Sequence, residues 1–296
     1  MTQSALRHII AIVMSTLSKN EEYPEIPSTR RDDLHNLEEM EEARLVLFMA
    51  GNQYMVMEEL IGAFQKRHPE VEKIFYETLP PGLALRQILA GGALFQGSMI
   101  TGRPDIYTSV TKDAIEELDI RGLVDESRIY LHNRIILMVP KGNPANIRNI
   151  NDLDRDGLRI SQPGALEDIT KYIVDMYERA GGKALVSRIM EEKRAEGSTI
   201  LTIVHHRETP LRLGKGTVDV GPVWATEAVH AKREGLGFEV VEVGERLDQR
   251  HRVNYYITKL RNAPNHQNAE KFLSFILSEE AQMIYESYGF VPYAKS

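Results

Sequence analysis

Apolar residues follow a regular pattern along the chain from position 44 onward. Residues 45–50 (LVLFMA) form a continuous apolar run that ends at Gly51, which is typical of a strand buried on both faces. The apolar residues at 56–64 then recur at helical spacing. The same order of strand, turn and helix is predicted at 73–89 and again at 105–118. Strands that alternate with helices in this way predict an α/β fold.

A second α/β set interrupts the first. Its strands are predicted near 159–161, 200–204 and 218–220, and its helices near 168–180 and 225–234. Strands at 134–140 and 252–258 flank this set, and two helices follow at 269–285. We therefore expect two lobes joined by a two-strand hinge, which permits closure around a ligand. The expected lobe 1 comprises residues 44–131 and 256–296, and lobe 2 comprises residues 132–255 with the hinge strands.

Residues 1–43 fall outside this pattern. After Arg7 and His8, residues 9–14 form a short apolar run that fits either a degenerate export signal or a short amphipathic helix. Residues 20–43 hold two prolines and many acids with few apolar residues, which predicts a mobile linker followed by a short helix. We therefore expect a deletion of residues 1–40 to leave the melting midpoint of the remaining chain nearly unchanged.

Composition narrows the classes of function. With 296 residues, of which 42% are hydrophobic, the chain is long enough to bury the cores of two lobes. Its formal charge of -7 arises from mixed signs, which disfavours nucleic acid as a partner. No apolar run approaches the roughly 20 residues that cross a bilayer, so membrane insertion is not expected. The chain has no cysteine, and no nucleophile elbow or HExxH motif, so we expect no enzyme activity and no cofactor.

Several short segments, by their order and spacing, resemble the molybdate-binding proteins and their relatives among the class II periplasmic solute-binding proteins of ABC transporters. These segments are MAGNQ at 49–53, LALRQILAG at 83–91, PDIY at 104–107, LMVPKGNP at 137–144, GPVW at 221–224, SEEAQ at 278–282 and YGF at 288–290. The likeness runs from about Arg44 to Tyr293. It implies a periplasmic-binding-protein fold of type II, an extracytoplasmic location and a transporter membrane component as partner.

The resemblance also implies how the ligand is held. A small oxyanion such as molybdate or tungstate is expected in the cleft between the lobes, bound without a counter-charge by hydroxyls and by backbone N–H groups at helix N-termini. In lobe 1 the matching positions are Asn52 and Gln53, then Pro81 and Gly82. The family typically has a serine where Asn52 and Pro81 stand, and Pro81 offers neither a hydroxyl nor an N–H group. Ser109 ends a predicted strand at the edge where α/β sheets bind ligands.

In lobe 2 the resemblance places the contacts at the start of a helix, in a histidine-rich segment and at the only tryptophan. These residues are Asp168, Ile169, His205, His206, Arg207 and Trp224. Imidazole and guanidinium groups suit a carboxylate or a phosphate, although the segment around His206 also fits a solvated loop. A carboxylate beside a bound dianion would cost roughly 1 to 4 kcal/mol. We expect Asn52, His206 and Trp224 to meet in one pocket.

Two functions and three ligand classes follow from these patterns. The first function is the capture of a small anion for ABC-type uptake. The alternative is an intracellular module of the same fold that senses a small organic carboxylate, which would place the chain in the cytoplasm. An oxyanion is the first expected ligand and a metal ion the third. A small organic carboxylate is the second because of the lost hydroxyls, the segment His205 to Arg207 and Trp224.

Overall fold

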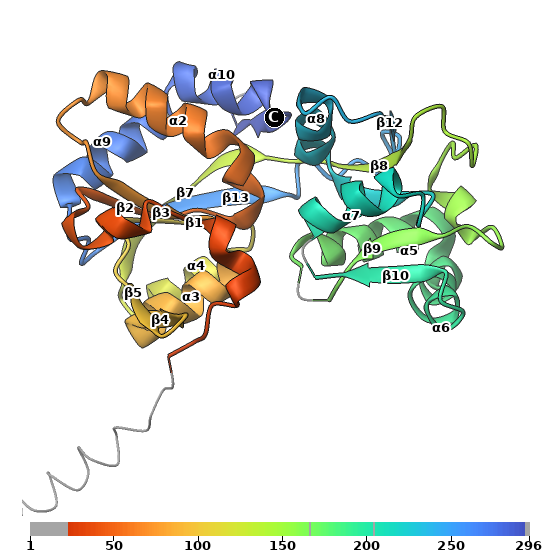
Figure 1. The fold of residues 1–296 in the computed structure, drawn as a ribbon, viewed down its shortest axis with the longest axis horizontal. Helices are drawn as coiled ribbons and strands as arrows, with labels where there is room; N and C mark the ends of the chain where they lie inside the picture. The colour runs from red at the N-terminus through yellow and green to blue at the C-terminus, as the bar shows by residue number, and fades with distance from the viewer. Residues whose placement is uncertain (1–22, 166, 204, 294–296) are drawn as a thin grey trace, which may run out of the picture.

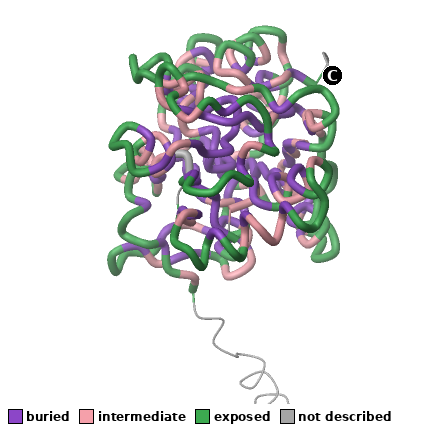
Figure 2. The backbone as a smooth tube through the Cα atoms, turned by 90° about the vertical axis from the view of Figure 1, so that its right-hand side faces the viewer, coloured by how far each residue is buried: buried purple, intermediate pink, exposed green. Residues whose placement is uncertain are grey.

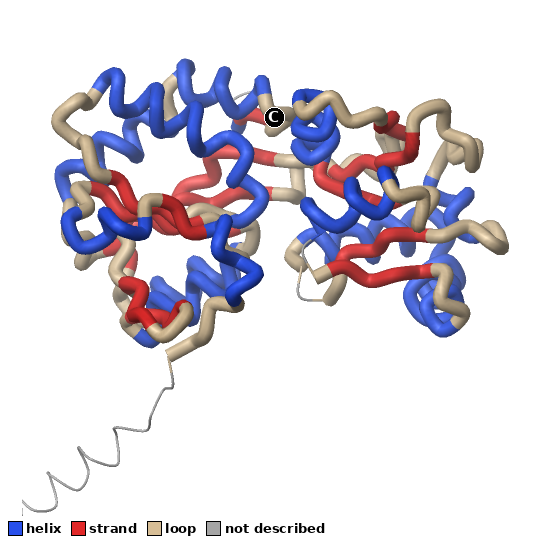
Figure 3. Tube along the Cα trace, in the orientation of Figure 1, coloured by secondary structure: helices blue, strands red, loops and turns tan. Residues whose placement is uncertain are grey.

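Two lobes joined by a narrow connection make up the molecule (Figure 1). The computed structural model describes residues 23–165, 167–203 and 205–293. Both lobes have strands covered by helices, and Figure 3 shows the strands in two separate groups. The two-lobed α/β fold predicted from the sequence is thereby confirmed. Among the described residues, no helix has the length and apolar character that a bilayer crossing requires.

Lobe 1 is built on one mixed sheet. Its strands are β1 (Leu34–His35), β2 (Leu45–Phe48), β3 (Ile74–Glu77), β6 (Ile106–Ser109), β7 (Val124–His132), β13 (Asn254–Leu260) and β14 (Val291–Pro292). Their order in the sheet is β1-β3-β2-β6-β13-β7-β14. β2 pairs in parallel with β3 and β6, whereas β13 pairs antiparallel with β6 and β7. β13 thus returns to the centre of this sheet after the whole of lobe 2 has intervened in the sequence.

Helices cover both faces of this sheet. On one face lie α2 (Tyr54–Arg67), α9 (His266–Ile276) and α10 (Glu279–Ser287), and on the other lie α3 (Pro81–Ala90) and α4 (Lys112–Ile120) (Figure 1). Successive side chains of a strand point to opposite faces. Leu45 and Leu47 accordingly join the core that includes Phe64 of α2, while Val46 and Phe48 join a second core. Burial on both faces explains why the sequence of β2 is apolar without alternation.

Lobe 2 holds two smaller sheets. Their strands are β8 (Ile135–Pro140), β9 (Ile160–Pro163), β10 (Thr199–Thr202), β11 (Gly221–Trp224) and β12 (Phe238–Val241). β8 lies between β11 and β12, and β9 pairs in parallel with β10. Around them pack α5 (Ile169–Ser187), α6 (Lys193–Ala195), α7 (His205–Gly214) and α8 (Ala225–Arg233). The chain enters this lobe after β7, at residues 133–134, and leaves it just before β13.

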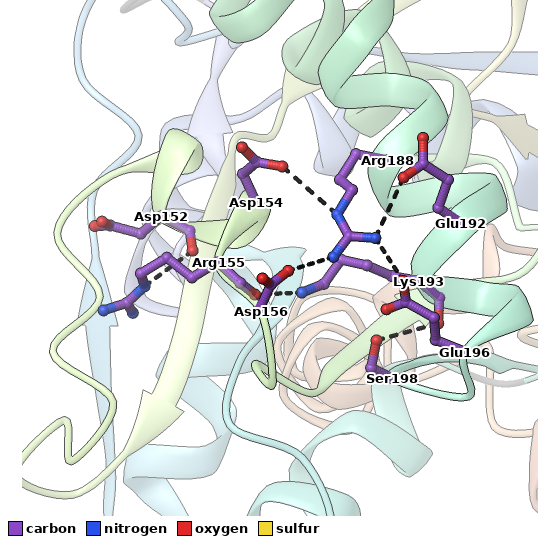
Figure 4. A network of polar contacts seen from close by, with 9 residues as sticks. All are labelled: Asp152, Asp154, Arg155, Asp156, Arg188, Glu192, Lys193, Glu196 and Ser198. Carbon is purple, nitrogen blue, oxygen red and sulfur yellow. Dashed lines mark hydrogen bonds and ion pairs between the residues drawn. The ribbon is translucent and has the colours of Figure 1, made fainter.

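One arginine forms a network of ion pairs in the outer part of lobe 2. Arg188 contacts four carboxylates, and Figure 4 shows them arranged around its guanidinium group. They belong to Asp154, Asp156, Glu192 and Glu196, at distances of 3.8, 2.6, 3.3 and 2.7 Å. The network joins the end of the 3-10 helix η4 (Ile150–Asp154) to the region that follows α5. Its carboxylates are exposed, so the network lies at the surface of the lobe and has no part in the site described below.

Residues 23–43 are not the linker that their composition predicts. They form the 3-10 helices η1 (Ser28–Asp33) and η2 (Leu37–Glu42) and the edge strand β1, which pairs with β3. Ile26 is 1% exposed, and its N–H donates to the carbonyl of Leu94 in β4 (Gly92–Phe95), which forms a hairpin with β5 (Ser98–Thr101). A few well-placed apolar residues therefore anchor a segment that is mostly polar. Residues 1–22, where the export signal was considered, lie outside the described residues.

Burial follows this arrangement. Figure 2 shows buried stretches of backbone gathered inside the molecule and exposed stretches along its outer loops.

The segment that begins at His205 differs from the solvated loop that its sequence also fits, because it forms helix α7. Its apolar residues are few and Pro210 lies within it, so its sequence carries little helical signal.

Candidate functional site

A small pocket lies between the two lobes. From lobe 1 it is lined by Arg30, Ala50, Gly51, Asn52, Pro80, Pro81 and Val110, and from lobe 2 by Glu167, Asp168, Ile169 and Trp224. Its cavity volume is about 30 Å³, roughly two to three times the space that one water molecule needs. In this arrangement of the lobes the pocket therefore suits a ligand of few atoms.

Five helices begin at this pocket. Gly51 and Asn52 lie in the 3-10 turn η3 (Gly51–Gln53) that leads into α2, Pro81 is the first residue of α3, and Val110 precedes the N-cap of α4. Asp168 and Trp224 are the N-cap residues of α5 and α8. The first turn of a helix has N–H groups without partners inside the helix and a positive partial charge. The pocket therefore gathers partial positive charge from both lobes.

The starts of these helices are not closed by side chains. For α2, α3, α4, α5 and α8, the side chain of the N-cap residue accepts no hydrogen bond from the first turn of its helix. Of the two helices that begin away from the pocket in lobe 1, Ser278 caps α10, whereas α9 also lacks a side-chain cap. Some first-turn N–H groups are paired with backbone carbonyls, as that of Ala225 is with Arg134, and an anion at a helix start could accept from those that remain.

The lobe 1 wall is fixed by buried polar contacts. The Asn52 amide donates to the hydroxyl of Tyr255, which also accepts from Nδ2 of Asn133 at 3.2 Å. The hydroxyl of Tyr107 donates to the carbonyl of Pro81 at 2.9 Å and so holds the start of α3. At Gly51, a Cβ atom would lie 3.1 Å from the carbonyl oxygen of Thr78, so a larger residue would displace the loop before α2.

The lobe 2 wall combines an aromatic residue with carboxylates. Trp224 is 2% exposed and lies beside Tyr172, with ring centroids 6.0 Å apart. Burial raises the pKa of Tyr172 to about 12, so its hydroxyl keeps its proton and can donate to the carbonyl of Val110 in the other lobe, 3.4 Å away. Glu167 and Asp168 add two carboxyl groups to this wall, and both interact with other groups of the chain.

Arg30 is the site residue that sequence reasoning missed. It lies in η1, within the segment interpreted as a linker, yet it is only 8% exposed and lines the pocket. Its Nη1 donates to Oδ2 of Asp33 at 3.3 Å, and Nη2 of Arg207 donates to Oδ1 of the same carboxylate at 2.5 Å. Burial raises the pKa of Asp33 above its usual value, and the two guanidinium groups oppose this shift. No local signal in the sequence indicates this role, because it depends on how η1 packs on lobe 1.

The structure brings together about half of the residues expected to bind the ligand. Those that line the pocket are Asn52, Pro81, Asp168, Ile169 and Trp224. The side chains of His205 and His206 lie outside the described part of the structure, so the expected approach of His206 to Asn52 and Trp224 stays a prediction.

The other expected residues are placed differently. Gln53 is fully buried and its Oε1 accepts hydrogen bonds from Tyr130 and Tyr285, both at 2.8 Å, so it serves the core of lobe 1. Ser109 accepts from the N–H of Thr111 at 3.0 Å. Gly82 is exposed in the first turn of α3.

Arg207, also expected at the ligand, points to Asp33 and lies 5.9 Å from the ring centre of Tyr54. It therefore takes part in a contact between the lobes, and it does not line the pocket. Among the described residues, no group of three or more His, Cys, Asp and Glu side chains is arranged to hold a metal ion.

Comparison with solved structures identifies the type of fold. The periplasmic molybdate-binding protein of Azotobacter vinelandii superposes with a TM-score of 0.65 at 17% identity, over 83% of this chain and 98% of the other. The sulfate-binding protein SubI of Mycobacterium tuberculosis H37Rv superposes with a TM-score of 0.65 at 18% identity, over 84% of this chain and 86% of the other. These similarities establish the periplasmic-binding-protein fold and do not by themselves identify a ligand.

Sequence comparison places the family. YvgL of Bacillus subtilis strain 168, named as a candidate ABC transporter substrate-binding lipoprotein, is 21% identical over 196 residues, which cover 63% of this chain and 66% of YvgL. The chain thus matches just under two thirds of that relative's length. The model of the bacterial extracellular solute-binding proteins matches residues 45–291, which include both lobes and all but Arg30 of the pocket. The chain therefore belongs to the bacterial extracellular solute-binding protein family, and it is a solute-binding protein and not an enzyme.

Proposed function

We propose that this protein captures a small anion of the molybdate or sulfate type in the pocket between its lobes and delivers it to the membrane component of an ABC transporter. The observation that carries this proposal is the meeting of five uncapped helix starts at one pocket of about 30 Å³. The partial positive charge at helix starts favours an anion there. The small volume favours a compact one.

The proposed binding residues are those that line the pocket from both lobes. Asn52 and the start of α3 at Pro81 would contact the anion from lobe 1. The backbone at Asp168 and Ile169 would contact it from lobe 2, and Trp224 would exclude water from that side. Displacement of water strengthens each electrostatic contact, because the local dielectric constant falls. The family and the lipoprotein relative support an extracytoplasmic site of action as part of this proposal.

A small organic carboxylate is the second candidate ligand, with an intracellular sensing role as the alternative function. Arg30 is the observation that favours a carboxylate, because a planar guanidinium group can bind both carboxylate oxygens in parallel. A carboxylate of few atoms, such as formate or acetate, would match the volume of the pocket. The two candidates differ in ligand geometry and charge, so a single panel of ligands distinguishes them.

Thermal unfolding across an anion panel tests the proposed function. The panel comprises sodium molybdate, tungstate, sulfate, phosphate, formate and acetate, each compared with sodium chloride at equal ionic strength. A ligand at 100 times its Kd stabilises the folded protein by about 2.7 kcal/mol. At least one oxyanion is expected to raise the unfolding midpoint by several degrees. If no anion does so, while a neutral solute or a metal ion does, the proposed function is wrong.

A further inference from the structure

We propose that the guanidinium group of Arg30 binds the negatively charged group of the ligand. The segment of residues 23–43 would then contribute a binding residue that the rest of the two lobes does not provide. This inference rests on the proposed function, because it assumes that the ligand is an anion. It goes further in two ways. It assigns a specific cation, Arg30, to the pocket, and it states that the ligand's negative charge pairs with a guanidinium group.

The first argument is the burial of a cation with few partners. The side chain of Arg30 is 10% exposed, and its one partner among the described residues is Asp33, at 3.3 Å. A guanidinium group has five N–H donors, and a buried cation is costly unless acceptors satisfy them. The pocket that Arg30 lines is the place where such an acceptor can sit. An oxyanion or a carboxylate would supply two or more oxygens at once.

The second argument is the charge balance around Asp33. This carboxylate is fully buried and forms ion pairs with both Arg30 and Arg207, so the two guanidinium groups share one buried carboxylate. An anion on the pocket side of Arg30 would supply the second negative charge. Charges would then alternate from Arg207 through Asp33 and Arg30 to the ligand. Glu167 and Asp168 stand on the lobe 2 wall, so an anion is expected to place its charge on the Arg30 side.

The third argument is the position of η1 between the lobes. η1 belongs to lobe 1 through β1 and Thr78, whose N–H donates to the carbonyl of Asp33 at 2.8 Å. Through Asp33 it also reaches Arg207 in α7 of lobe 2. Arg30, which would bind the anion, is therefore three positions before Asp33, which links the two lobes. Anion binding at Arg30 is expected to favour the arrangement in which this tie is formed.

Binding titrations on three variants test this assignment. Arg30→Gln removes the charge, Arg30→Lys keeps the charge but loses the planar fork, and Arg31→Gln removes the same charge from the exposed neighbour in η1. The probes are sodium molybdate, sodium sulfate, sodium phosphate and sodium acetate, measured by calorimetry on the full chain. Circular dichroism checks that each variant is folded.

The assignment predicts a specific order of affinities. Arg30→Gln is expected to weaken binding of the preferred anion by about 10- to 100-fold, as loss of a hydrogen bond to a charged group does. Arg30→Lys should lie between this variant and the native protein, and Arg31→Gln should stay within about 3-fold of the native value. The loss in Arg30→Gln should be larger for a dianion than for acetate.

Two results would overturn the assignment and separate it from the proposed function. If the native protein binds one of these anions and folded Arg30→Gln binds it equally well, the anion is held without the charge of Arg30, and only this inference fails. If the native protein binds none of these four anions and none of the others in the unfolding panel, both the proposed function and this inference fail.

Discussion

Glu77 shows how a single buried carboxyl group can set the pH dependence of stability. It lies on β3 with no exposed surface, and Nε2 of Gln87 donates to its Oε2 at 3.0 Å. Burial raises the pKa of Glu77 well above its usual value, and this hydrogen bond opposes the shift only in part. A carboxyl group whose pKa is raised in the folded state keeps its proton when the unfolded state has already lost it. The folded protein therefore loses stability as pH rises from the unfolded pKa to the folded pKa.

We expect Glu77→Gln to remove this loss. Each unit by which the folded pKa exceeds the unfolded one costs about 1.4 kcal/mol above the folded pKa. The variant should therefore be more stable than the native protein at pH 8, and the difference should shrink toward pH 4, where the native carboxyl group is protonated in both states. Urea unfolding from pH 4 to 8 measures this, with Glu72→Gln at an exposed position as control. If the stability of the native protein and that of Glu77→Gln change with pH in the same way, Glu77 is not the source of this pH dependence.

At the scale of elements, residues 23–40 provide the clearest test of the packing. The sequence predicts that removal of residues 1–40 leaves the melting midpoint unchanged, but the structure leads to the opposite expectation. A chain that begins at Glu41 loses the burial of Ile26 and Leu34 and the pairing of β1 with β3. Two buried aliphatic side chains contribute roughly 3 to 6 kcal/mol, so the midpoint should fall by roughly 5 to 10 °C relative to a chain that begins at Tyr23. Equal midpoints for the two truncated chains would show that this packing contributes nothing.

The elements that could be predicted from sequence are those that bury a large apolar area. β2 and α2 have unbroken or periodic apolar patterns, and both were located within a few residues. The short helix expected before residue 43 corresponds to η2, but α7, η1 and β1 were not predicted, because a few apolar side chains anchor mostly polar segments whose contacts come from distant parts of the chain. β11 was expected at 218–220 but begins at Gly221, because Val220 forms only an isolated bridge to Ile160.

The same reasoning explains which parts of the site could be predicted. Asn52 and Trp224 lie at strand-to-helix junctions, which the sequence pattern marks, and both line the pocket. Arg30 lies in a segment without such a pattern. Gln53 is adjacent to Asn52 in the sequence, but its side chain points in a different direction. It contacts Tyr130 and Tyr285 in the core of lobe 1. Side-chain direction at one residue depends on packing that spacing alone does not determine.

At the scale of the whole molecule, contacts between the lobes hold this arrangement beyond the two crossings of the chain. Arg233 of α8 donates to the carbonyl of Ser287 at 2.9 Å, and its guanidinium group lies 3.7 Å from the ring centre of Tyr288. Arg233 also lies 4.0 Å from Glu59 of α2. Since α8 belongs to lobe 2 and the other residues to lobe 1, these contacts favour the closed pocket. They form a second tie between the lobes, separate from the contact between Arg207 and Asp33.

We expect Arg233→Gln to weaken ligand binding although Arg233 does not line the pocket. The observed affinity of a protein that binds in one arrangement of its lobes falls with the fraction of molecules in that arrangement. The side chain of Arg233 is 39% exposed, so the loss should be modest, about 2- to 5-fold, and should appear mainly in the dissociation rate. Small-angle scattering of the ligand-free variant should show a larger radius of gyration. Arg252→Gln is the control, because Arg252 pairs with Asp175 at 2.6 Å within lobe 2. If Arg233→Gln and Arg252→Gln change affinity and radius to the same extent, the contacts of Arg233 do not control closure.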